Sequence, residues 1–228
     1  MTSFPDFEYF KNDYTWFFKP KDKIELAAGE LPLGPEFEKT FPGLHALVGT
    51  ARITDVKINK HNYKLLAWTL QDGEPCGWLC LVEDAAVNDL RLLPEHKLLL
   101  QHIGGIKESF NQPDGSFSNN QNFLFVQSLC EKGLGGWEEV YLEECNYVKA
   151  EPLPIDELIT FVQEANGNIT VYHMETKQVY LYAHDHAFDN VTAVPGQPEY
   201  TFHYINDVNN FVDYVEALAK QWTEHLSA

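Results

Sequence analysis

The chain alternates between apolar and polar residues over much of its length, with the period of two that is typical of half-buried β-strands. The alternation begins at residues 51–58 and continues at 63–70 and 78–82. The short turn 71–75 separates the last two runs and contains aspartate, glycine and proline. Because such residues favour tight turns, we predict that these three strands form an antiparallel meander.

Further short apolar runs predict more strands in the second half of the chain. They lie at 122–126, 139–142, 158–162, 168–173 and 178–184. The glycine-rich segment 133–136 separates the first two, and the polar stretch 111–122 is predicted to be a loop. Asn166-Gly167 and Glu175–Lys177 lie between the last three runs, which indicates hairpins.

Two segments carry helical signals. Pro94 suits the first turn of a helix over 94–103, and Gly104-Gly105 can provide the left-handed cap at its end. In the C-terminal segment, apolar residues recur at helical spacing, at 208, 211, 212, 215, 218, 219 and 222. They predict a closing helix with one apolar face, capped by Asn206 or Asp207.

Aromatic residues crowd the beginning of the chain. They stand at positions 4, 7, 9, 10, 14, 16, 17 and 18, and prolines follow at 20, 32, 35 and 42. We expect an irregular arm or a short helix that its rings hold on the body of the protein. The alternative is an exposed aromatic cluster that contacts a partner.

These elements predict an α+β fold, in which a mostly antiparallel twisted sheet is flanked by a few helices and the C-terminal helix packs on the sheet. Residues 1–90 are predicted to form an N-terminal aromatic arm and strand-rich extension packed on the main body, and residues 91–228 an α+β domain. One continuous domain over 1–228 is the alternative, because 228 residues suit one large domain or two small ones.

The balance of charge narrows the function. The chain has 16 lysines and arginines against 34 aspartates and glutamates, a formal net charge of −18. This charge disfavours binding to nucleic acids or anionic membranes, because both would be repelled. It suits a basic protein partner, divalent cations or solubility alone. No pattern indicates an oligomeric state.

The sequence predicts neither a membrane span nor a signal peptide. No apolar run reaches the length of a membrane span, and the first residues have neither a basic region nor an apolar core of a signal peptide. We therefore expect a cytoplasmic protein. The four cysteines, at 76, 80, 130 and 145, are irregularly spaced and are expected to be reduced and packed as small apolar side chains.

Few motifs indicate chemistry. His184-Asp185-His186, with Asp189, has the His-x-His spacing found in metal sites, and the alternative is a polar loop in which Asp185 bonds to the backbone. The serines lack a nucleophile elbow, and the glycine-rich segment 133–136 lacks the Lys-Ser/Thr ending of a P-loop. The main prediction is no catalytic residue, no metal and no cofactor.

The candidate binding surface combines aromatic and acidic residues. It comprises Trp137, Glu138, Glu139, Tyr141, Glu143, Glu144, His184 and Asp185. The carboxylates would attract a basic protein and the rings would anchor it. The alternative is that the rings face the core and the acids only solvate the surface.

Four segments, in order within residues 90–225, resemble the SUKH superfamily. They are a short helix ending in Gly-Gly (Leu93–Gly105), a strand that enters a glycine turn (Leu158–Asn168), a hairpin (Tyr172–Asp185) and the start of a closing helix (Ile205–Phe211). The hairpin turn lacks the glycine usual in the family, and residues 1–90 have no counterpart there.

The resemblance implies an α+β binding protein without catalytic residues. Members of the superfamily include yeast regulators of cell-wall glucan synthesis and many bacterial immunity proteins. We therefore expect an immunity-type inhibitor of a toxin effector, for example a nuclease, in a bacterial cytoplasm. The alternatives are a regulatory or scaffold module for an endogenous partner, and a metal-dependent enzyme that uses His184 and His186.

Overall fold

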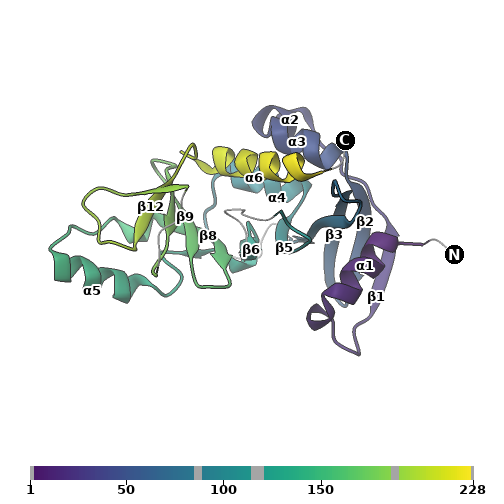
Figure 1. Cartoon of the computed structure of the whole chain (residues 1–228), viewed down its shortest axis with the longest axis horizontal. Helices are drawn as coiled ribbons and strands as arrows, with labels where there is room; N and C mark the ends of the chain where they lie inside the picture. The colour runs from purple at the N-terminus through teal and green to yellow at the C-terminus, as the bar shows by residue number, and fades with distance from the viewer. Residues whose placement is uncertain (1–2, 85–88, 114–120, 186–189, 227–228) are drawn as a thin grey trace.

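The computed structural model describes residues 3–84, 89–113, 121–185 and 190–226 (Figure 1). The strands are β1 (Ile24–Ala28), β2 (Arg52–Ile58), β3 (His61–Thr69), β4 (Pro75–Val82), β5 (Gly105–Phe110), β6 (Gln121–Leu124), β7 (Glu131–Lys132), β8 (Leu158–Glu164), β9 (Ile169–His173), β10 (Val179–Tyr182), β11 (Val191–Ala193) and β12 (Phe202–Ile205). The helices are α1 (Pro5–Asp13), α2 (Pro35–Thr40), α3 (Pro42–Gly49), α4 (Pro94–His102), α5 (Glu138–Val148) and α6 (Phe211–His225).

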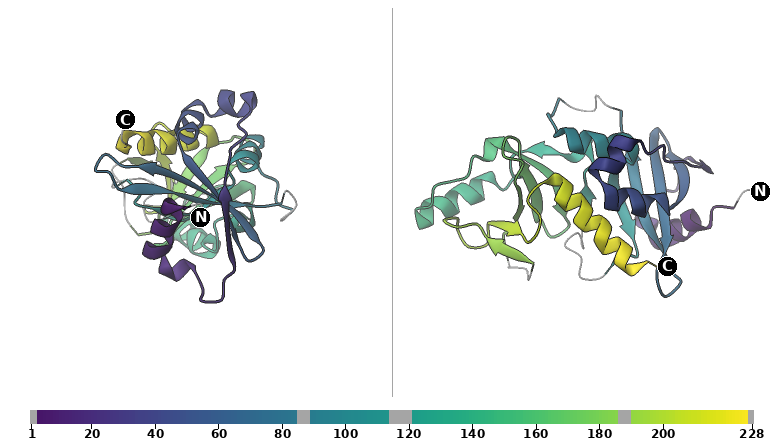
Figure 2. Two further views of the ribbon diagram at one scale, coloured as in Figure 1. Left: turned by 90° about the vertical axis from the view of Figure 1, so that its right-hand side faces the viewer. Right: turned by 90° about the horizontal axis from the view of Figure 1, so that it is seen from above.

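The strands form one antiparallel sheet. Their order is β1-β2-β3-β4-β5-β6-β8-β9-β10-β12-β11, and β7 pairs with β8 beside this path. The sheet twists strongly, and α6 lies along it beside α2, α3 and α4 (Figures 1 and 2). The predicted α+β class, with a C-terminal helix packed on the sheet, is therefore confirmed.

The predicted meander over residues 51–82 is also confirmed as β2-β3-β4. In the β2–β3 pair Thr54 faces Leu65, and in the β3–β4 pair Leu65 faces Leu79. Gly104, with a φ of 80°, ends the predicted helix α4 in the left-handed conformation. A Cβ at this position would come within 2.4 Å of the Leu81 carbonyl oxygen, so only glycine fits the close approach to β4.

The main core draws on residues from both sides of residue 90. Three tryptophans form its centre: Trp68 and Trp78 lie 5.0 Å apart between ring centroids, and Trp222 of α6 lies 5.0 Å from Trp78. All three are buried. The sheet also continues across this position, because β4 pairs with β5. Burial of apolar side chains therefore links residues 1–90 to residues 91–228, which the sequence suggested as an extension and a domain.

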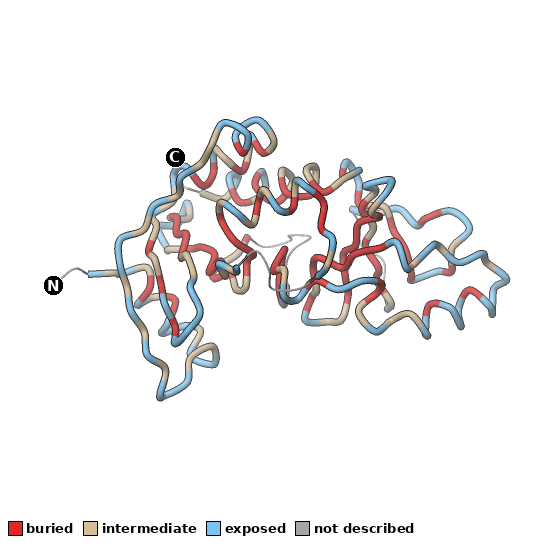
Figure 3. Tube along the Cα trace, turned by 180° about the vertical axis from the view of Figure 1, so that it is seen from behind, coloured by how far each residue is buried: buried red, intermediate tan, exposed pale blue. Residues whose placement is uncertain are grey.

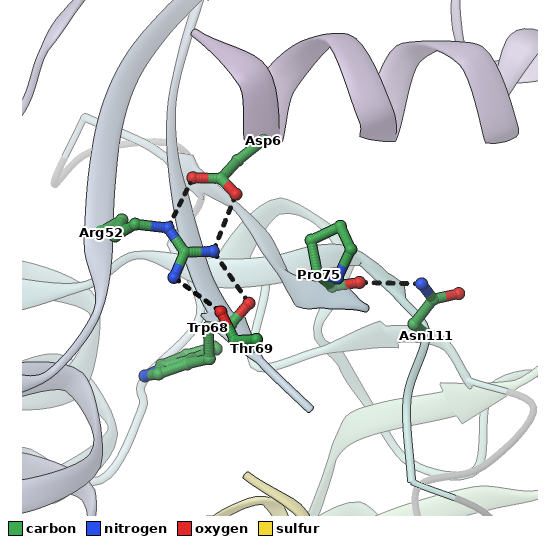
Figure 4. Close-up of polar contacts among 6 residues, drawn as sticks. All are labelled: Asp6, Arg52, Trp68, Thr69, Pro75 and Asn111. Atoms are coloured by element: carbon green, nitrogen blue, oxygen red, sulfur yellow. Dashed lines mark hydrogen bonds and ion pairs between the residues drawn. The ribbon is translucent and has the colours of Figure 1, made fainter. Parts of the chain in front are cut away.

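The aromatic N-terminal segment forms the short helix that was one of its two predicted forms. Phe7 and Phe10 of α1 are buried against the sheet. Arg52 of β2 holds the helix by a two-pronged contact with the Asp6 carboxylate, at 2.9 and 2.8 Å, and also donates to the Trp68 carbonyl oxygen (Figure 4). The alternative of an exposed cluster fits only the Trp16 side chain, which is 70% exposed.

Asn111 also joins α1 to the sheet. Its amide nitrogen donates to the Tyr9 hydroxyl at 2.9 Å. The same nitrogen donates to the Pro75 carbonyl oxygen at 2.8 Å (Figure 4). The helix is thus held both by its buried rings and by side-chain hydrogen bonds to Arg52 of β2 and to Asn111, which directly follows β5.

The start of the C-terminal helix was predicted wrongly. Asn210, rather than Asn206 or Asp207, caps α6: its side-chain oxygen accepts from the N–H groups of Val212 and Asp213, at 2.9 and 3.1 Å. The apolar spacing began at Val208, but Asp207 has a φ of 62° and Val208 bridges back to Ile205. A turn therefore occupies the positions at which the sequence suggested a cap.

The strand predicted at 139–142 was also wrong, because these residues lie inside α5. Valine and tyrosine favour strands, and this local preference suggested the strand. Packing decides otherwise: Tyr141 and Cys145, four residues apart, are buried on one side of a helix. The acidic residues Glu138 and Glu139 occupy its first turn, where the helix dipole favours negative charge.

Candidate functional site

The candidate surface centres on α5, which lies at the end of the molecule opposite β1 (Figure 1). Glu138 fixes its start, because the carboxylate accepts a hydrogen bond from the Leu134 N–H at 2.7 Å. The helix ends at Val148, and the next residue, Lys149, has a φ of 61° that lets the Ala150 N–H donate to the Cys145 carbonyl oxygen at 2.9 Å. The carboxylate of Glu138, which was predicted as a binding residue, thus already forms a hydrogen bond within the chain.

Tyr141 was predicted as a surface residue, and the structure corrects this. Its side chain is buried and packs edge-on against Phe202, with 5.0 Å between ring centroids. The hydroxyl accepts from the Leu153 N–H at 2.7 Å and donates to the Gln197 side-chain oxygen. A ring at this helix position faces the core, so Tyr141 supports the surface from beneath and cannot contact a partner directly.

Outside this buried side, most of the circumference of α5 is exposed and carries both apolar and acidic side chains. The exposed fractions of its large apolar residues are 43% for Val140, 43% for Leu142, 83% for Tyr147 and 49% for Val148. Glu139, Glu143 and Glu144 are exposed on the same helix, and none of them forms an ion pair with another described residue. We call these seven residues the α5 face; Figure 3 shows its exposed turns.

Trp137 and His184, which are distant in sequence, lie together at the start of α5. Their rings stack with 4.2 Å between centroids, and the Trp137 indole N–H donates to the Gly167 carbonyl oxygen at 2.9 Å. A Cβ on Gly167 would come within 3.2 Å of the Trp137 ring and 3.3 Å of the His184 ring. The β8–β9 turn therefore fixes both rings, while Asp185 beside them is exposed.

The alternative metal site gains no support from the described residues. No group of three or more histidine, cysteine, aspartate or glutamate side chains lies close enough together there to hold a metal ion. His184 is stacked on Trp137, and its Nδ1 is buried without a hydrogen-bond partner in the described part of the chain. His186 and Asp189, the other predicted ligands, lie outside the described residues.

One buried acid near this turn was not predicted. Glu164 ends β8 and is only 7% exposed. The pKa of its carboxyl is raised to about 7. Burial is the main cause, the amides of Asn168 and Asn166 oppose the rise, and the nearby Asp185 carboxylate adds a smaller increase. In sequence, Glu164 before Ala-Asn-Gly resembles an ordinary turn residue, so no local pattern reveals its burial.

Tyr214 of α6 contributes to the environment of Glu164. The tyrosine is fully buried, and its pKa is raised by this burial first and by the Glu164 carboxylate second. The two side chains therefore lie near one another where α6 packs on β8, with the Tyr214 ring 5.2 Å from the Phe161 ring. The Glu164 carboxyl lies next to the candidate surface but belongs to the interior.

Comparisons with known proteins returned no relative. No protein-family model matches the chain, and neither the curated proteins nor the solved structures contain a match. The resemblance to the SUKH superfamily therefore stays a prediction. Among the described helices, none has the length and apolar character needed to cross a bilayer.

Proposed function

We propose that this chain is a non-catalytic protein-binding module that engages a basic protein through the α5 face. The observation that carries the proposal is the exposure on one helix of four large apolar side chains together with three carboxylates that have no ion-pair partner among the described residues. Val140 and Tyr147 are seven residues apart and therefore share one side of α5 with Glu143 and Glu144. Large exposed apolar side chains that lie together in this way mark interaction sites.

Charge selects the class of partner. The net charge of −18 produces a negative potential around the whole chain, and Glu139, Glu143 and Glu144 concentrate negative charge on α5. A basic surface would be attracted over several ångströms and then be held by the apolar residues. Tyr147 is the best anchor, because a large amphipathic ring with few rotatable bonds loses little entropy on binding.

The biological role that we propose is that of an immunity-type inhibitor, which blocks a toxin effector such as a nuclease in a bacterial cytoplasm. This part rests on the resemblance of residues 90–225 to the SUKH superfamily and on the acidic charge. A nuclease needs a basic surface to hold nucleic acid, so an acidic face with embedded apolar side chains would compete for that surface.

The test is capture of the partner followed by measurement of its affinity. Tagged full-length chain captures proteins from its own cells at low salt, and binding of the purified basic partner is then titrated against three variants. Tyr147→Ala is expected to weaken binding by about 5- to 30-fold, in the range of interface anchors. Glu143→Lys is expected to weaken it at least as much and to reduce its dependence on salt.

Glu38→Lys is the matched control, because Glu38 is exposed on α2 and undergoes the same change of charge away from α5. Its affinity is expected to stay within about twofold of the unsubstituted chain, apart from the small general effect of net charge. A partner whose affinity responds equally to Glu38→Lys and Glu143→Lys, and not to Tyr147→Ala, would show that the α5 face is not the binding site.

A further inference from the structure

The strand β1 forms an open edge of the sheet at the end of the molecule farthest from α5 (Figure 1). It pairs with β2 on one side, and no other described strand pairs with it. Seen from that end, β1 runs in front of the other strands (Figure 2, left). Its outer row of backbone groups is therefore available to another strand.

The hydrogen-bond register shows which backbone groups point outwards. The Gly29 N–H donates to the Ile53 carbonyl oxygen at 3.1 Å, and the Asn59 N–H donates to the Lys23 carbonyl oxygen at 2.8 Å. Because antiparallel strands alternate, the odd-numbered residues 23–29 direct their N–H and C=O groups to β2. The even-numbered residues, Ile24, Leu26 and Ala28, direct theirs away from the sheet.

This edge lacks the usual protection against pairing. Its sequence, Ile-Glu-Leu-Ala-Ala, contains no proline, lysine or arginine, and Ala27 and Ala28 are exposed and small. The one charged residue, Glu25, already has a cation beside it, since its carboxylate lies 3.8 Å from the Lys57 ammonium. Ile24 and Leu26 are half-buried against the cluster that contains the rings of α1.

We propose that the outer edge of β1 is an interface between two copies of this chain, which join β1 to β1 antiparallel about a two-fold axis at Leu26. In this register Ile24 faces Ala28 of the partner subunit, and Glu25 faces Ala27 of the partner subunit. Within residues 24–28 no like charges stand opposite one another, and each outward-facing pair exchanges two backbone hydrogen bonds.

Charge sets the conditions under which the copies associate. Each copy carries −18, so the copies repel one another at low ionic strength. Salt screens this repulsion, and dimerisation is therefore strengthened by salt. Binding of a basic protein to the α5 face has the opposite dependence, so the two interactions are separable, and the dimer does not rest on the proposed function.

The test is sedimentation velocity of the full chain over a range of concentrations, at low and high salt. The unsubstituted chain is expected to dimerise, and more strongly at high salt. Leu26→Pro removes an outward N–H and leaves the β1–β2 bonds in place, and is expected to weaken the dimer by about tenfold or more. Circular dichroism of the same samples checks that the fold is kept.

Substitutions at Ala27 test the register and need no change in the fold, because this side chain is exposed. Ala27→Lys places a cation opposite Glu25 of the partner subunit and is expected to strengthen the dimer by about 2- to 30-fold, and Ala27→Glu to weaken it similarly. Leu129→Lys is the control for net charge, since Leu129 is 37% exposed on another part of the surface.

Three results would overturn the proposal. They are a chain that stays monomeric at every concentration and salt, a dimer that weakens as salt rises, and a dimer on which Ala27→Lys and Ala27→Glu have the same effect. Because none of these measurements involves α5, they leave the test of the protein-binding function independent.

Discussion

Glu216 links the C-terminal helix α6 to the N-terminal helix α3, and its removal is the sharpest test of how these two parts of the chain are held together. Its carboxylate accepts from the N–H groups of Gly43 and Leu44, at 2.7 and 3.1 Å, in the first turn of α3. This turn has no cap of its own, because Phe41 precedes it and Pro42 begins it. The side chain of one helix therefore supplies the missing cap of another.

The expected cost follows from these two bonds. A hydrogen bond to a charged group contributes about 1.5–3 kcal/mol, so two give an upper limit of about 3–6 kcal/mol. The site is part-buried and water can replace some of this, so Glu216→Ala is expected to lower the free energy of unfolding by about 2–3 kcal/mol. For a chain of this size that corresponds to a fall in Tm of about 4–12 °C.

Urea unfolding, followed by tryptophan fluorescence and circular dichroism, measures the change as a lower midpoint at an unchanged slope. Glu224→Ala is the control on the same helix, because Glu224 only approaches Lys220 at 3.9 Å on the exposed side. It is expected to cost no more than about 0.5 kcal/mol. If Glu216→Ala cost as little as this control, the reasoning would be refuted.

Gly43→Ala provides a second check, because its effect on the free energy of unfolding is expected to change sign when Glu216 is removed. A Cβ at this position would come within 2.6 Å of a Glu216 carboxylate oxygen, so Gly43→Ala is expected to destabilise the unsubstituted chain by displacing the cap. In the Glu216→Ala background the obstacle is gone, and Gly43→Ala is expected to stabilise by about 0.5–1 kcal/mol, as alanine does in a helix. Equal effects in both backgrounds would show that the two groups are not coupled.

Three other predictions concern buried polar groups. Because the pKa of Glu164 is raised to about 7, the folded state holds this proton more tightly than the unfolded state does. The free energy of unfolding is therefore expected to fall by up to about 3 kcal/mol as pH rises from about 4.5 through 7. Glu164→Gln is expected to remove this loss when urea unfolding is compared at pH 5 and pH 8. Burial lowers the pKa of His96 to about 4, so the neutral ring stabilises the fold above pH 6.5. This stabilisation, up to about 3 kcal/mol, is expected to be lost as pH falls from about 6.5 to 4. His96→Gln is expected to flatten this part of the plot of unfolding free energy against pH. Tyr141→Phe leaves the Leu153 N–H without its acceptor and is expected to cost about 1–3 kcal/mol in thermal unfolding, whereas an unchanged Tm would contradict the buried hydrogen bond.

Sequence patterns predict the elements whose period is regular and whose turns are chemically distinct. The β2-β3-β4 meander and the β8-β9-β10 hairpins belong to this class, since Asn166-Gly167 and similar turns separate their apolar runs. The short helices α2 and α3 were missed. Each begins with a proline, Pro35 and Pro42, and the prolines suggested irregular chain although they occupy the first helical turn, where proline is favoured.

The candidate site was predictable only in part, because its geometry depends on contacts between distant segments. Trp137 and His184 were both candidate residues, but their stacking depends on Gly167, which local sequence does not connect with either. Tyr141 was placed on the wrong side because helix and strand periods put its side chain on different faces. Glu164 is buried and lies near Tyr214 of α6, and a pattern within β8 contains no information about that proximity.

The position of α6 also constrains the order in which the chain can fold. Trp68 and Trp78 are made early in synthesis, but Trp222, which covers them, follows only after more than a hundred further residues. Until then the apolar face of β3 and β4 is open to water, and the growing chain is exposed to self-association. Closure between segments so far apart in sequence is slow, so we expect nascent chains of this protein to need chaperones or low concentration more than a helical bundle of the same size.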